Sequence, residues 1–106
     1  MEVSLKDLKE LFSVGVGGQS HPYPVGKNVF IRTVTMSHTG RLVEVTDKEL
    51  VLEDACWIAD TGRFTDFLES GKLNECEPFP VGRVIVGRGA VVDCCEWKHT
   101  LPRSQK

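Results

Sequence analysis

Apolar and polar positions in this chain alternate in short runs, a pattern that is typical of β-strands rather than of long helices. Runs rich in β-branched and aromatic residues occupy five stretches, at 28–35, 41–45, 50–58, 83–87 and 90–97. Residues that favour turns separate most of these runs, for example around Gly40 and Asp47. Five strands of this length predict a small, mainly β domain over residues 28–97.

The first 27 residues have a different pattern. Leucine and phenylalanine recur at helical spacing between Leu5 and Phe12, directly after Ser4, which can cap a helix. Glycines and prolines follow this stretch and exclude regular structure. The pattern predicts an N-terminal helix and a loop over residues 1–27.

A helical insertion is expected between the third and fourth strands, within residues 59–80. Phe64 and Phe67 form part of an apolar helical face there, and Gly71 can end the helix. At the other end, residues 98–106 are polar and basic and are predicted to form a flexible tail.

Length and composition restrict the class of protein. The chain has 106 residues, of which 41% are hydrophobic and 26% charged, which suits a single domain over residues 1–106. A separate cofactor domain is excluded, and we expect no cofactor. An apolar run of the ~20 residues needed to cross a bilayer is missing, so we expect no membrane partner. The first residues lack a secretory pattern, which predicts a cytoplasmic protein.

Charge is distributed unevenly along the chain. The formal net charge is −2, but residues 44–77 carry ten acids against three bases. The flanking segments are basic, with an excess of two bases over residues 1–43 and of three over residues 78–106. Because non-specific nucleic-acid binding requires an excess of Lys and Arg, an anionic ligand would have to bind at a local site.

The cysteines favour packing over metal binding. Cys56, Cys76, Cys94 and Cys95 form no CxxC pair, and adjacent residues of a strand point to opposite faces. We expect reduced, partly buried thiols and no metal site. The usual spacings of catalytic nucleophiles, bases and zinc-binding histidines are also missing, which predicts a protein that is not an enzyme.

Arginine and aromatic side chains are the candidate ligand-binding groups. The guanidinium group of arginine matches a phosphate, and aromatic rings stack on bases. The candidates are Arg32, Arg41, Arg63 and Arg88 for phosphates, and His38 and Trp57 for a base. The alternative is that the arginines pair with the acidic segment and that the tryptophan fills the core.

Two stretches resemble a known family. Residues 40–55 hold a turn glycine, a strand, a loop with Asp47 and an apolar strand, and residues 85–92 hold an apolar strand that enters Arg88-Gly89 and returns. The pattern resembles the Sm-like family of ring-forming barrels over most of residues 4–97. It implies a small five-stranded Sm/SH3-like barrel with an N-terminal helix and a short helical insertion between strands three and four. It also implies subunits joined into a ring, with nucleic acid bound at residues 47–49 and 88–89.

A second resemblance is to small bacteriophage proteins, carried by residues 30–35, 52–57, 60–64 and 75–78. This resemblance implies that the protein is located in the cytoplasm of an infected bacterial host. We therefore expect a non-enzymatic nucleotide-binding protein, an anti-defence sponge that sequesters cyclic nucleotide immune signals in a homo-oligomer such as a hexamer. The alternatives are an Sm-like ring that binds single-stranded RNA and a phage structural or assembly protein.

Overall fold

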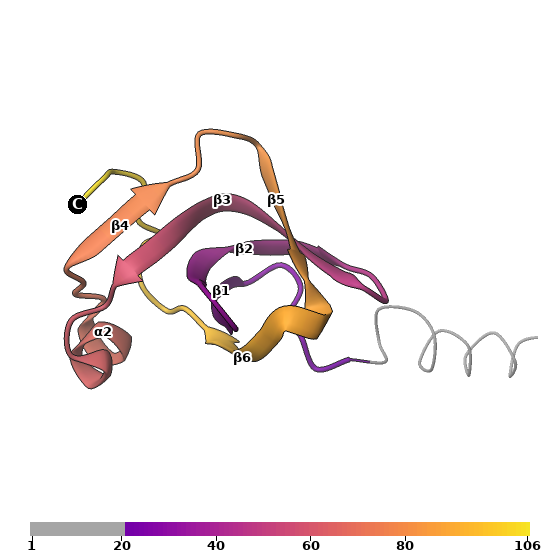
Figure 1. The fold of residues 1–106 in the computed structure, drawn as a ribbon, viewed down its shortest axis with the longest axis horizontal. Coiled ribbons are helices and arrows are strands. Elements are labelled where there is room, and N and C mark those ends of the chain that lie inside the picture. The colour runs from indigo at the N-terminus through magenta and orange to yellow at the C-terminus, as the bar shows by residue number, and fades with distance from the viewer. Residues whose placement is uncertain (1–20) are drawn as a thin grey trace, which may run out of the picture.

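The chain folds into an antiparallel sheet with one short helix, as shown by a computed structural model that describes residues 21–106 (Figure 1). The elements are β1 (Asn28–Thr33), β2 (Ser37–Val45), β3 (Glu49–Asp60), α2 (Phe64–Ser70), β4 (Glu75–Pro78), β5 (Arg83–Gly87), the 3-10 helix η2 (Arg88–Ala90) and β6 (Val91–Glu96). The mainly β class and the helical insertion are confirmed. The predicted N-terminal helix, around residues 4–13, lies outside the described residues.

Within residues 21–106 the sheet has six strands and is open. Its order is β4-β3-β2-β1-β6, and β5 pairs with β3 next to β4. β4 lies along the second half of β3, from Cys56 to Asp60, and β5 lies along the first half, from Glu49 to Glu53. The predicted five-stranded barrel is confirmed only in its mainly β character: β4 adds a sixth strand, and in the described part of the chain β5 and β6 do not pair, so the sheet is not closed.

A bend in β3 separates β4 from β5. Asp54 adopts a positive φ of 53°, a conformation that Asp and Asn tolerate better than most residues. At the next residue, the carbonyl of Ala55 accepts a hydrogen bond from the backbone of Phe79, at 2.9 Å. The chain thus leaves β3 after β4 and returns to it as β5. In Figure 1, β3 arches over β2 along this bend.

The turn between β1 and β2 lies earlier than predicted. Residues 37–40 were expected to form a turn, but they belong to β2. Gly40 serves close packing there, because a Cβ atom at this position would lie 3.2 Å from the Cβ of Leu52. The actual turn is closed by Thr33, whose backbone N–H donates to the carbonyl of Met36 at 2.7 Å.

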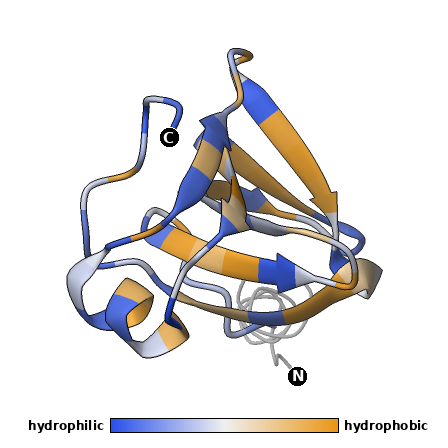
Figure 2. Cartoon of the chain, turned by 60° about the vertical axis from the view of Figure 1, so that its left-hand side comes forward, coloured by the Kyte–Doolittle hydropathy of each residue, from blue (hydrophilic) through white to orange (hydrophobic). Residues whose placement is uncertain are grey.

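Hydrophobic residues pack on both faces of β1. Val29 and Ile31 point to one side, into a cluster inside the curved sheet, with Leu42, Leu50, Leu52, Ala55 and Val86. Phe30 points to the other side, into a second cluster beneath α2, with Cys56, Ile58, Phe67, Leu73, Cys76 and Trp97. Figure 2 shows hydrophobic stretches along the strands, interrupted by hydrophilic positions. Burial on both faces explains why the centre of β1 holds three consecutive apolar residues, Val29, Phe30 and Ile31.

The C-terminal segment packs against the sheet, whereas residues 98–106 were predicted to form a flexible tail. Lys106 and Cys76 exchange both backbone hydrogen bonds, each 3.0 Å long, so the segment lies along the outer edge of β4. Arg103 donates from Nη1 to the carbonyl of Ala55 at 3.0 Å. The tail was predicted from its polar composition, but its hydrogen bonds are made by the backbone and by one guanidinium group.

Candidate ligand-binding site

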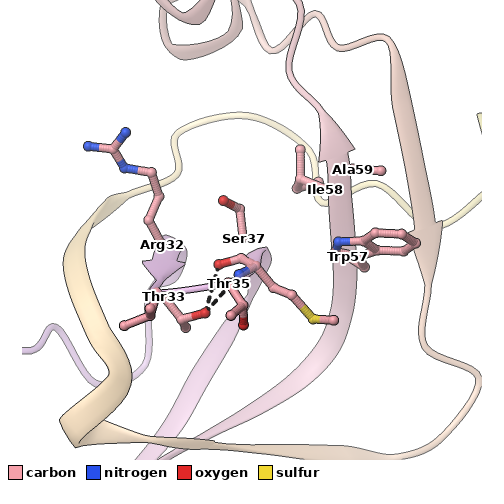
Figure 3. Close-up of a pocket in the computed structure, with 9 residues that line it drawn as sticks. Arg32, Thr33, Thr35, Ser37, Trp57, Ile58 and Ala59 are labelled. Atoms are coloured by element: carbon pink, nitrogen blue, oxygen red, sulfur yellow. Dashed lines mark hydrogen bonds between the residues drawn. The ribbon is translucent and has the colours of Figure 1, made fainter.

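A surface pocket of about 280 Å³ lies at the turn between β1 and β2 (Figure 3). It is lined by residues 32–37 of the turn and by residues 57–59 of β3. Two of the sequence-predicted ligand-binding residues, Arg32 and Trp57, therefore line the same pocket. They reach it from different strands, because β2 pairs with β3 and places Trp57 beside the end of the β1–β2 hairpin.

Hydroxyl groups line the pocket between these two side chains. Thr33 builds the turn, since its Oγ1 donates to the carbonyl of Met36 at 2.9 Å and accepts from the Met36 N–H at 3.0 Å. Thr35 and Ser37 also line the pocket with their hydroxyl-bearing side chains (Figure 3). These residues were not predicted as site residues, although hydroxyl residues at every second position after Arg32 were the available signal.

Arg32 is held at the rim of the pocket by two other side chains. Its Nε donates to Oδ1 of Asp93 at 2.9 Å, and its Nη2 donates to Oδ2 of the same carboxylate. The guanidinium carbon lies 5.0 Å from the centre of the Phe64 ring. In Figure 3 the side chain extends away from Trp57. The pairing raises the pKa of Arg32 and lowers that of Asp93, chiefly through their hydrogen bonds.

Trp57 lies between two surface pockets. Its side chain lines the pocket at the turn and also a smaller groove formed by residues 77–80. It is half-buried, so part of the indole is in contact with solvent. A partly exposed indole is suited to stacking on a planar ligand.

His38 is buried, which differs from the predicted contact with a base. It is 7% exposed, pairs across the sheet with Trp57, and its ring centre lies 5.9 Å from that of Phe79. Burial lowers the pKa of His38 and so favours the neutral ring. Within residues 21–106 its Nδ1 has no hydrogen-bond partner. Its place beside Trp57 makes it a support for the pocket wall.

Arg41 pairs with acidic residues, as the alternative interpretation proposed. Its Nη2 donates to Glu53 at 2.7 Å and its Nη1 donates to Asp54 at 2.8 Å. Arg83 of β5 joins the same group through its Nε, 3.1 Å from Glu53. These contacts connect β2, β3 and β5, and Arg41 lies outside the residues that line the pocket.

The last two candidate arginines lie outside the pocket lining. Arg88 donates from Nη1 to the carbonyl of Thr46, and its guanidinium carbon lies 5.3 Å from the centre of the Tyr23 ring. Arg63 is exposed directly before α2. The structure thus brings Arg32 and Trp57 together at the pocket and leaves Arg41, Arg63 and Arg88 away from its lining.

The four cysteines form no disulfide: Cys56 and Cys76 are buried and Cys94 is partly buried, as predicted, whereas Cys95 is exposed. Among residues 21–106, no group of three or more His, Cys, Asp or Glu side chains is placed to hold a metal ion. No helix in this part of the chain is both long enough and apolar enough to span a membrane. Searches for similar proteins found no matching family model, curated protein or solved structure.

Proposed function

We propose that this protein binds a nucleotide-type anion in the pocket between Arg32 and Trp57 and leaves the ligand chemically unchanged. The observation that carries the proposal is that Arg32 and the half-buried Trp57 line one pocket. A phosphate would bind at the arginine, and a base would stack on the tryptophan. The hydroxyls of Thr35 and Ser37 would supply further hydrogen bonds.

The size of the pocket favours a ligand shared between copies. At about 280 Å³ it lies just below the usual range of roughly 300–1,000 Å³ for small-molecule sites. It can take one base with part of its sugar-phosphate, whereas a cyclic dinucleotide has two bases and two phosphates. Two pockets from neighbouring copies would hold such a ligand. Sequestration of a cyclic nucleotide signal, as expected for a phage anti-defence sponge, would use this arrangement.

A second candidate function is an Sm-like ring that binds RNA, or an assembly protein built through the same contacts. Two strand edges favour it: in the described part of the chain β5 pairs only with β3, and β6 only with β1. Both edges carry an exposed aliphatic side chain, with Ile85 at 67% and Val92 at 63% exposure. Open edges with exposed apolar residues favour pairing with another chain.

Calorimetry tests the first candidate directly. The purified protein is titrated with cyclic di-GMP, cyclic di-AMP, 5′-AMP and a short uridine oligonucleotide. We expect binding to a cyclic nucleotide, loss of at least about tenfold in affinity for Trp57→Ala, and a smaller loss for Arg32→Ala. Arg83→Ala is the control, because it removes one exposed arginine outside the pocket lining.

The possible outcomes separate the candidates. Binding to the oligonucleotide alone would support the RNA-binding ring, and a variant series without effect on binding would exclude this pocket. Ligand recovered unchanged after heating the complex distinguishes binding from turnover. Thermal melting of each variant shows whether the fold is retained.

A further inference from the structure

Asp93 occupies the position that a ligand phosphate needs on Arg32. Both carboxylate oxygens accept hydrogen bonds from the guanidinium group, one of them at 2.9 Å. This two-pronged contact is the geometry by which arginine also binds a phosphate. The two groups would therefore compete for the same donors.

The position of the pair supports this competition. Arg32 and Asp93 are direct partners in the β1–β6 register, and their side chains are 44% and 48% exposed. The contact is thus open to solvent, and an ion from solution can reach it. Exposed ion pairs are weak, so their exchange for another anion costs little.

Among the described residues that line the pocket, Arg32 is also the only cation. While Asp93 is bound to it, the charge of the guanidinium is neutralised and its side chain extends away from Trp57 (Figure 3). A pocket in this state has an aromatic wall and hydroxyl groups but no free positive charge. A neutral planar molecule could contact the wall, whereas a phosphate must first displace the carboxylate.

We propose that Asp93 is a competing internal anion that a phosphate-bearing ligand displaces from Arg32. This inference rests on the proposed function, because it assigns a specificity-determining residue to the same pocket. Because Asp93 must first be displaced, the affinity for every anion is lowered by a similar factor. The lower affinity is most apparent for anions that bind weakly, such as chloride and inorganic phosphate. Ligands that also stack on Trp57 can overcome the penalty.

The substitution Asp93→Asn tests this role, with cyclic di-AMP and inorganic phosphate as probes. We expect affinity to increase by about two- to fivefold, the range set by the strength of an exposed ion pair. Glu96→Gln is the matched control, because it removes one exposed carboxylate from the same strand. It should change affinity by less than about 1.5-fold if the effect depends on direct competition and not on net charge.

A double-mutant cycle identifies the group through which Asp93 acts. In an Arg32→Ala background, Asp93→Asn should no longer increase affinity. A gain that persists without Arg32, or an equal gain for Glu96→Gln, would overturn the competition. If neither the unaltered chain nor Asp93→Asn binds any probe, the proposed function itself fails. Binding of equal strength in both would overturn only the role of Asp93.

A measurement on the unaltered chain covers the case in which Asp93→Asn does not fold. The Nε–H resonance of Arg32 reports its acceptor, which is Oδ1 of Asp93 in the free protein. Saturation with cyclic di-AMP should shift this resonance as the acceptor changes from carboxylate to phosphate. An unmoved Arg32 resonance in a saturated complex would show that Asp93 stays bound, contrary to the proposal.

Discussion

Phe67 of α2 packs edge-on against Phe30 of β1, with ring centres 4.8 Å apart and an interplanar angle of 68°. Both side chains are almost fully buried, at 0% and 1% exposure. The helix has only seven residues, which is too short to be stable alone in water. Its stability therefore comes from the burial of Phe67 against the outer face of the sheet.

Truncation of this contact should destabilise the whole domain. We expect Phe67→Ala to lower the free energy of unfolding by about 3–5 kcal/mol, as for other buried aromatic residues. Phe64→Ala is the control on the same helix, because Phe64 is 40% exposed and should cost about 1 kcal/mol. Urea unfolding followed by circular dichroism measures both. An equal loss of unfolding free energy in the two variants would show that the burial of Phe67 does not stabilise α2.

Stability should decrease in mild acid because of His38. Burial lowers its pKa in the folded state below the ordinary value of 6.5, so between these two values the unfolded chain binds more protons. The contribution is complete above pH ~6.5 and is lost as the pH falls toward the folded-state pKa, with a slope of at most about 1.4 kcal/mol per pH unit. His38→Phe should remove this component from the unfolding free energy measured between pH 7.5 and 5. Identical slopes for the variant and the unaltered chain would contradict it.

Alanine substitutions at three glycines can separate two causes of strain, a positive φ and a close contact of the added Cβ atom. Gly71 ends α2 with a φ of 77°, and a Cβ there would lie 2.9 Å from Cγ of His99. Gly26 has a φ of 91° but open space around it, and Gly87 has open space without a positive φ. We expect alanine to be nearly neutral at Gly87, to cost about 1–2 kcal/mol at Gly26, and to cost more at Gly71. Thermal unfolding gives the order, and an equal cost at Gly26 and Gly71 would exclude the contact with His99.

Assembly through the open edges is tested at Ile85. If β5 pairs with another copy, Ile85→Lys should convert the oligomer to a monomer in native mass spectrometry, because a charge would be placed on the paired edge. Val81→Lys is the control, since Val81 is 56% exposed but lies between β4 and β5. A monomer in the unaltered chain, or an oligomer that survives Ile85→Lys, would contradict assembly through this edge.

The sequence predicted those elements whose local pattern agrees with their burial. β5 was found at its observed bounds because its apolar run stands between turn residues, and α2 was found from its apolar face and Gly71. β4 was missed because Pro78 suggests irregular structure, whereas its pairing with β3 depends on residues distant in the chain. The β1–β2 turn was misplaced because its closing hydrogen bonds come from Thr33, a residue that also favours strands.

The candidate site could be predicted only in part. Arginine chemistry selected Arg32 but could not distinguish it from Arg41, whose two acidic partners become neighbours only when β2 pairs with β3. The role of Asp93 was equally hidden, since it lies 61 residues from Arg32 in sequence. Side-chain type indicates which chemistry is available, and strand pairing decides which groups face a ligand.

The most direct test of the binding site is a titration followed by the two indole N–H resonances in a proton–nitrogen NMR spectrum. Trp57 lines the pocket, whereas Trp97 is 4% exposed and donates its Nε1–H to the carbonyl of Thr100 at 3.2 Å. With cyclic di-AMP or cyclic di-GMP, we predict that the Trp57 resonance shifts to saturation while that of Trp97 stays in place. Saturable binding that leaves the Trp57 resonance unmoved would contradict a ligand site between Arg32 and Trp57.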